Sequence, residues 1–260
     1  ATSVTVAGTF GYLIGGLLGE VSVGLAFGMQ ALCLSLSAVL FFFFLKNDRG
    51  ESAGKIPVKH IAREANPFSA FLSAGQFMTA IFAVLFAVVF LMNFAFTAYD
   101  QCFNYYIKDQ FGFTSVYNGL IKAAIGVISL AANMTLCMYI LQKTDAAKSE
   151  VKVLLISAAA LFGAIASDLV IPFILLTVVY LSMNSVCVPV LQSMVAGAAR
   201  KEQSNIVMGF YNAMRSFGQV CGAAFAGFAY AGGPKTPFFW AGAALLLAAA
   251  GAFAYVRMRK

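Results

Sequence analysis

Long apolar stretches, separated by short polar segments, run along almost the whole chain. A helix needs about 20 apolar residues to cross the hydrocarbon core of a membrane. Eight stretches are predicted to do so: residues 1–19, 21–45, 77–99, 117–141, 153–167, 169–199, 206–233 and 236–256. The alternating ten-residue pattern of a membrane barrel is absent, so helices are expected. The pattern therefore predicts an all-α membrane protein, a polytopic bundle of helices.

One long polar segment, residues 46–76, divides this pattern unevenly, with two predicted spans before it and six after it. We expect three parts: two helices in residues 1–45, a connecting loop in 46–76 and a six-helix unit in 77–260. Within the loop, Ile56–Ala65 forms either a short amphipathic helix on the membrane surface or part of a disordered tether.

The composition agrees with a membrane protein. Hydrophobic residues make up 61% of the chain and charged residues 10%, whereas soluble domains carry about 25% charged residues. The net charge of +7 does not indicate a nucleic acid partner, because the basic residues lie in short loops between apolar spans. The lipid bilayer is the expected partner.

The basic residues also predict which side of the membrane each loop faces. Of the 17, 13 lie in one alternate set of connections, which are residues 46–76, 142–152, 200–201 and the tail from Arg257. Cytoplasmic loops carry the excess of Lys and Arg. The 46–76 loop and the C-terminus are therefore expected in the cytoplasm, in a multi-pass protein.

No chemistry of an enzyme or a metal site is indicated. The five cysteines occur singly, without the spacing of metal ligands or of a disulfide framework. No HExxH motif, Ser–His pairing or pair of carboxylates at membrane depth is present. We expect neither catalysis nor a metal nor a cofactor.

Small residues recur at helical spacing in two predicted spans. Ala7, Gly11, Gly15 and Gly19 form one such ridge, and Gly218 and Gly222 form another. Small residues at this spacing let helices approach closely in a membrane. Each ridge is either a static packing surface or a surface on which two halves of a transporter glide. A bulky change such as Gly15→Leu is expected to block either role.

Polar side chains lie inside four of the predicted spans, where they are costly and usually face a cavity or a partner. We regard them as candidates for a substrate or ion pathway: Asn93, Thr97, Asp100, Lys122, Ser129, Asn133, Asn184, Gln192, Asn212, Arg215 and Gln219.

The charged members of this set have different expected roles. Asp100 and Lys122 lie at similar depth on consecutive antiparallel spans, so they form either a structural ion pair or a coupling site. Asp100 is the one carboxylate expected well within a span, which makes it the candidate proton site. Arg215 lies near mid-depth and needs an acceptor, which is either backbone carbonyls, a substrate or a residue outside this sequence.

The layout resembles helices five to twelve of a Major Facilitator Superfamily transporter, in which two six-helix halves flank a cytoplasmic loop. Residues 7–16, AGTFGYLIGG, are similar to the glycine-rich motif of helix five in its drug–proton antiporters, with Tyr12 where the family has Pro. Residues 204–212, SNIVMGFYN, with Ser216, Gly218, Gly222 and Gly227, resemble helix eleven of bacterial members. The resemblance implies that helices one to four lie outside this sequence, and that the first span faces Gly119, Ala123 and Gly126 of the fourth.

The resemblance implies a secondary transporter of small molecules that works by alternating access in a bacterial cytoplasmic membrane. We expect efflux of amphipathic, drug-like compounds by an antiporter coupled to H+ or Na+. Uptake of a sugar or organic solute is the alternative, and a non-transporting membrane scaffold or sensor is the alternative of another class.

Overall fold

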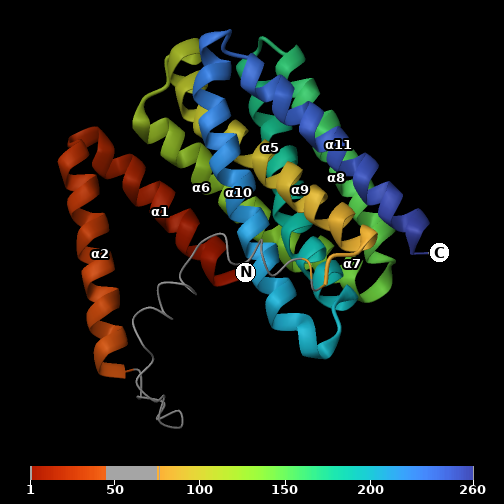
Figure 1. Ribbon diagram of the computed structural model, residues 1–260. Coiled ribbons are helices and arrows are strands. Elements are labelled where there is room, and N and C mark those ends of the chain that lie inside the picture. Colours follow the sequence, from red (N-terminus) through yellow and green to blue (C-terminus); the bar gives the residue numbers. More distant parts are fainter. Residues whose placement is uncertain (1, 45–74, 76, 260) are drawn as a thin grey trace.

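The computed structural model describes residues 2–44, 75 and 77–259 (Figure 1). The regular elements among these residues are all helices, which confirms the all-α prediction. In chain order they are α1 (Thr2–Val21), α2 (Val23–Phe44), α5 (Ala80–Phe111), α6 (Ser115–Ala132), the π-helix η2 (Asn133–Cys137), α7 (Met138–Lys143), α8 (Ala146–Ala166), α9 (Val170–Ala198), the 3₁₀ helix η3 (Lys201–Gln203), α10 (Ser204–Ala231) and α11 (Thr236–Met258). The predicted surface helix in the polar loop lies outside the described residues.

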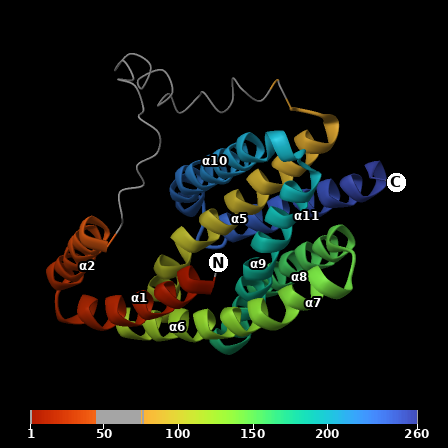
Figure 2. The same cartoon turned by 90° about the horizontal axis from the view of Figure 1, so that it is seen from below.

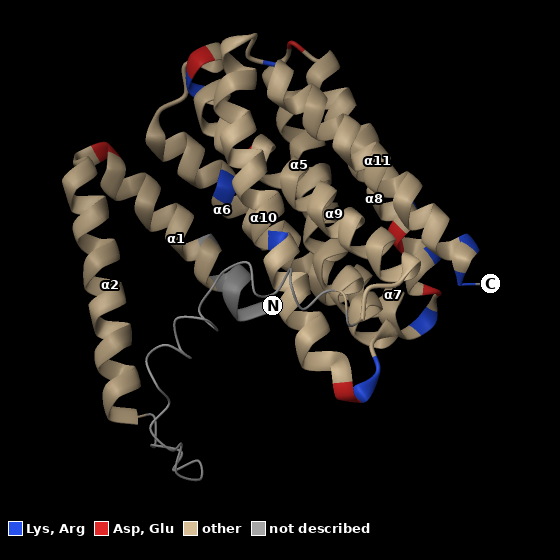
Figure 3. Ribbon diagram, in the orientation of Figure 1, with Lys and Arg blue, Asp and Glu red and all other residues tan. Residues whose placement is uncertain are grey.

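Six of the described segments are long and apolar enough to cross a membrane. They are α2, α5, the continuous segment of α6, η2 and α7, α8, α9, and α11. The other two predicted spans, α1 and α10, form helices of 20 and 28 residues but fall outside this set. In α10 the reason is its polar content, because it carries Asn212, Arg215 and Gln219. Charged residues lie mostly in the connections and at helix ends (Figure 3).

The end of α5 and the start of α8 differ from the boundaries that the apolar pattern predicts, because local capping interactions set them. The prediction that the third span ends at Tyr99 is wrong, since α5 continues to Phe111 and ends at Gly112. Gly112 has a φ of 66°, and its N–H donates to the carbonyls of Ile107 and Lys108. A left-handed glycine of this kind is a common end of a helix.

The prediction that residues 142–152 form a loop is also wrong. Helix α8 begins at Ala146, because the Asp145 carboxylate accepts hydrogen bonds from the N–H groups of Ala147 and Lys148. Its first two turns therefore contain Glu150, which is fully buried.

The helices of residues 77–259 pack into one bundle, with α1 along one side (Figure 2). Helix α5 contacts α10 and α11, α8 lies between α9 and α11, and α9 contacts α6. Helix α1 packs on α6, and α2 packs on α1. The core at one end is aromatic: the rings of Tyr99, Tyr106, Phe173 and Phe238 contact one another, and the Tyr99 hydroxyl lies 2.8 Å from the Thr177 hydroxyl.

Close approach of α10 to α5 depends on two glycines. A Cβ atom at Gly218 would lie 2.5 Å from the Phe90 carbonyl oxygen, and one at Gly222 would lie 2.5 Å from the Phe94 carbonyl oxygen. Both distances are shorter than real Cβ contacts. The backbones therefore touch where the two glycines lie, in the manner of small-residue packing in membranes.

The glycine ridge of α1 does not make its contact with α6. A Cβ atom at Gly16 would lie 2.9 Å from the Gly119 Cα atom, whereas added Cβ atoms at Gly11, Gly15 and Gly19 would meet nothing within 4 Å. The contact is thus one residue out of register with the predicted ridge. Ala7, Gly11 and Gly15 line a groove between α1 and α2, together with Ala26, Gln30 and Cys33. Gly11 and Gly15 also line a second cavity beside Gly119 and Lys122 of α6, although Cβ atoms added there would not reach that helix.

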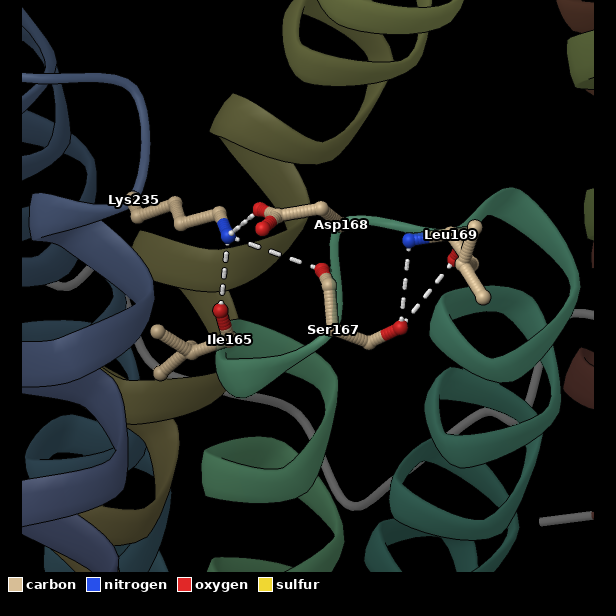
Figure 4. A network of polar contacts seen from close by, with 5 residues as sticks. All are labelled: Ile165, Ser167, Asp168, Leu169 and Lys235. Atoms are coloured by element: carbon tan, nitrogen blue, oxygen red, sulfur yellow. Dashed lines mark hydrogen bonds and ion pairs between the residues drawn. The ribbon is translucent and has the colours of Figure 1, made fainter.

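A polar network holds the end of α8 against the turn before α11 (Figure 4). The Lys235 ammonium donates to the carbonyl oxygens of Ile165 and Ser167, at 2.8 and 3.5 Å, and to Asp168 Oδ1 at 2.6 Å. The hydrogen bond from Lys235, together with its charge, lowers the pKa of Asp168 below its usual value. Lys235 therefore satisfies carbonyls at a helix C-terminus, where a cation is favoured.

Candidate functional site

A cavity of about 310 Å³ lies between α1, α5, α6, α9 and α10. Its wall contains seven of the polar residues that the sequence predicts for a pathway: Asn93, Asp100, Lys122, Ser129, Asn184, Arg215 and Gln219. Apolar side chains, including Phe96, Leu181 and Val188, complete the wall. We refer to this cavity as the central pocket. It joins polar groups from four helices, α5 and α6 with α9 and α10, which form two pairs well separated in the sequence.

The other predicted pathway residues lie outside the wall of the central pocket. Thr97 is half-buried on α5, and Gln192 and Asn212 are exposed. Asn133 begins the π-helix η2, and its amide donates to the Ser185 carbonyl at 3.1 Å. Since Ser185 lines the pocket, Asn133 supports the wall from behind. A π-bulge inside a helix is often found next to a functional site.

Asp100 and Lys122 form an ion pair across the pocket wall. The Lys122 Nζ atom donates to Asp100 Oδ1 at 2.8 Å, linking α6 to α5. The Lys122 side chain is 9% exposed and the Asp100 side chain 31% exposed. The Lys122 ammonium also lies over the Tyr12 ring, 5.0 Å from its centre, which adds a cation–π contact from α1. The two charges therefore compensate each other.

Arg215 has no such compensation among the described residues. It lies in the middle of α10 and lines the central pocket, but it makes no hydrogen bond or ion pair with the part of the chain that the structure describes. A guanidinium group has five N–H donors and is always charged. At membrane depth these donors require an acceptor.

The amide and hydroxyl groups of the pocket are partly occupied. The Asn93 amide donates to the Val89 carbonyl of its own helix at 2.8 Å. Ser185 Oγ donates to the carbonyls of Ser129 and Ser182. Asn184 is buried, and its side-chain oxygen has no hydrogen-bond partner. The pocket thus offers an open acceptor on α9 in addition to the donors of Arg215.

Sequence reasoning missed three polar residues that the structure brings into view. Tyr12, singled out only as a departure from a motif, supports the Lys122 ammonium. Ser185 lines the central pocket. Glu150 is fully buried in α8, its carboxylate oxygens lack a hydrogen-bond partner, and the Cys187 thiol of α9 lies beside it. The sequence does contain a signal for the burial of Glu150. It shares one helix face with Val153, Leu154 and Ser157.

Within the part of the chain that the structure describes, no group of three His, Cys, Asp or Glu side chains could hold a metal ion. Comparison with known proteins identifies one family. The family model described as Major Facilitator Superfamily matches residues 1–183. The search of curated proteins found no match. The matched range holds Tyr12, Asp100 and Lys122, while Arg215 lies beyond it.

Proposed function

The chain belongs to the Major Facilitator Superfamily, and we propose that it is a secondary active transporter whose central pocket is part of the path of a small molecule. The family and the six apolar helices make it a multi-pass membrane transporter in general terms. Alternating access of the pocket to the two sides of the membrane is the mechanism we assign to it.

One observation carries this proposal, which is the convergence of charged and polar side chains on a single cavity. Asp100, Lys122 and Arg215 come from three helices and all line the central pocket. Charged residues inside a membrane protein are rare, and they mark substrate and ion pathways. A scaffold or sensor, the alternative of another class, would gain nothing from an uncompensated Arg215.

We assign the direction as efflux because residues 7–16 resemble the glycine-rich motif of the drug–proton antiporters. The charged groups of the pocket and its apolar wall, which includes Phe96, Leu181 and Val188, suit amphipathic compounds. Uptake of a sugar or organic solute is the second candidate. The amides of Asn93, Asn184 and Gln219 favour it, since amides suit the hydroxyl groups of such solutes.

Coupling to H+ is assigned to Asp100, with Na+ as the other candidate ion. Asp100 is partly exposed to the pocket and paired with Lys122, so protonation would release Lys122 and change the charge of the wall. By the positive-inside rule, the 46–76 loop and the C-terminus face the cytoplasm. The resemblance of residues 204–212 to helix eleven of bacterial members supports a bacterial cytoplasmic membrane.

Proteoliposomes containing the full-length protein would test the function. A pH gradient is applied, and uptake is measured for 1-naphthalenesulfonate, its neutral amide 1-naphthalenesulfonamide, 1-naphthylmethylammonium and D-glucose. We expect one class to be carried, and Asn184→Leu to slow its transport. Asn205→Leu, at the exposed start of α10, serves as the control. Uptake of all four at the rate of protein-free liposomes would refute the transporter assignment.

A separate variant, Asp100→Asn, tests the assignment of proton coupling. Asp100→Asn is expected to remove the dependence of transport on the pH gradient while leaving exchange of substrate for substrate. An unchanged pH dependence in this variant would exclude Asp100 as the proton site.

A further inference from the structure

The charges of the central pocket do not cancel among the described residues. Three charged side chains line it: Asp100, Lys122 and Arg215. Asp100 and Lys122 neutralise each other at 2.8 Å. Arg215 is left over, so these side chains give the pocket one net positive charge. Arg215 is exposed among the described residues, so its donors are open to a ligand. A charge without a partner at membrane depth is costly, and binding an anion there would offset this cost.

Glu150 does not provide the missing negative charge. Its carboxylate oxygens are buried without a hydrogen-bond partner, and it forms no ion pair with Arg215. Glu150 also lies outside the residues that line the central pocket. Arg215 therefore has no carboxylate partner among the described residues.

The groups next to Arg215 suit the rest of such a ligand. Gln219 lies one helical turn further along α10 and also lines the pocket, so it adds a neutral donor beside the guanidinium. Phe96, Leu181 and Val188 form an apolar surface on the facing helices. A cavity of about 310 Å³ is at the lower end of small-molecule sites. This size suits one or two rings.

We propose that the substrate of the central pocket is an amphipathic organic anion, with its carboxylate, sulfonate or phosphate group held by Arg215 and its apolar body against α5 and α9. This inference rests on the proposed transport function and adds the substrate class. Arginine suits the role because its planar donor array matches such oxyanions in two parallel hydrogen bonds.

The test compares one anion with its neutral analogue of nearly the same shape. Full-length protein in nanodiscs is titrated by calorimetry with 1-naphthalenesulfonate and with 1-naphthalenesulfonamide. We expect the sulfonate to bind roughly tenfold tighter or more, as charge-assisted hydrogen bonds do. Arg215→Gln is expected to abolish this preference, and Arg215→Lys to retain a part of it. Arg257→Gln, at the exposed end of α11, is the matched control and keeps the preference unchanged.

The outcomes separate this inference from the proposed function. Sulfonate binding that depends on Arg215, without transport of any of the four compounds in proteoliposomes, would support the anion site and refute the transporter assignment. Transport of the sulfonamide or the naphthylmethylammonium cation in preference to the sulfonate would support transport and overturn the anion site. Equal binding of the two analogues by the wild-type protein, or no binding of the sulfonate, would also overturn it. These last two results are measured on the wild-type protein, so they do not depend on whether a variant folds.

Discussion

The Lys122 ammonium of α6 lies 2.8 Å from a carboxylate oxygen of Asp100 on α5. The pair closes one side of the central pocket and leaves Arg215 of α10 as the uncompensated charge of its wall. Lys122 is 9% exposed, so its charge depends on Asp100 much more than a surface lysine would depend on its partner.

The first prediction concerns this ion pair. Asp100→Asn should lower the free energy of unfolding by about 3 kcal/mol, near the lower end of the cost of breaking a buried pair, because Lys122 is left without its counter-charge. The double variant Asp100→Asn, Lys122→Met should recover most of the loss. Denaturant unfolding in detergent measures both. A double variant as unstable as the sum of the two single variants would contradict the pairing.

The second prediction compares neighbouring glycines of α1. Gly16→Leu should disrupt the contact with α6, where even a Cβ atom would lie 2.9 Å from Gly119 Cα. The sequence pattern alone predicts that Gly15→Leu is disruptive, but a Cβ atom at Gly15 meets nothing within 4 Å, so this variant should instead be tolerated. If Gly16→Leu folds but does not transport, the contact is a gliding surface, whereas loss of folding indicates static packing. A defect in Gly15→Leu alone would contradict the observed register.

The third prediction concerns the glycines of α10. Gly222→Ala should destabilise the protein by about 1–3 kcal/mol, the usual cost of overpacking, since its Cβ atom would lie 2.5 Å from the Phe94 carbonyl oxygen. Gly209→Ala has open space in the same helix and should stabilise it by about 1 kcal/mol through helix propensity. Thermal unfolding of the two variants checks the sign of each effect.

The fourth prediction concerns Glu150, which is buried without a hydrogen-bond partner for its carboxylate oxygens. Glu150→Met should raise the free energy of unfolding by about 1–3 kcal/mol, because an unsatisfied polar group is replaced by an apolar side chain of similar length. Glu202→Met, at an exposed position in η3, should leave stability nearly unchanged. A lower melting temperature for Glu150→Met would show that the carboxyl group has a stabilising partner.

The fifth prediction is a pH dependence outside the membrane-spanning segments. The hydrogen bond from Lys235 lowers the pKa of Asp168 below its usual 3.8 in the folded protein. A depressed pKa gives a stabilisation that is fully present above the unfolded-state value and is lost as the pH falls through the folded-state value. Wild type should therefore melt above Asp168→Asn at neutral pH, and the difference should vanish in acid. A difference that grows in acid would have the wrong sign.

The helices could be predicted from the sequence because a membrane-spanning helix is recognised by the length of its apolar stretch. That length does not depend on tertiary contacts. Boundaries were less certain, since they depend on caps. Asp145 starts α8 inside a polar segment, and Gly112 ends α5 after three polar residues. A hydropathy pattern contains no information on these local hydrogen bonds.

The candidate site was predicted in composition but not in geometry. The sequence placed Asp100 and Lys122 at similar depth on consecutive antiparallel spans, and the ion pair that it offered as one alternative is present in the structure. It did not show that Arg215 lines the central pocket whereas Asn212, one turn away, does not. The rotation of each helix decides this, and that rotation depends on packing at positions such as Gly218 and Gly222.

The most direct test of the account is the transport of 1-naphthalenesulfonate into proteoliposomes by wild-type protein, Arg215→Gln and Arg257→Gln. We predict saturable uptake by wild type and Arg257→Gln, in preference to the sulfonamide, and loss of that preference in Arg215→Gln. Equal uptake of the sulfonate by all three proteins, or its exclusion while the neutral amide is carried, would contradict an anion pathway through the central pocket.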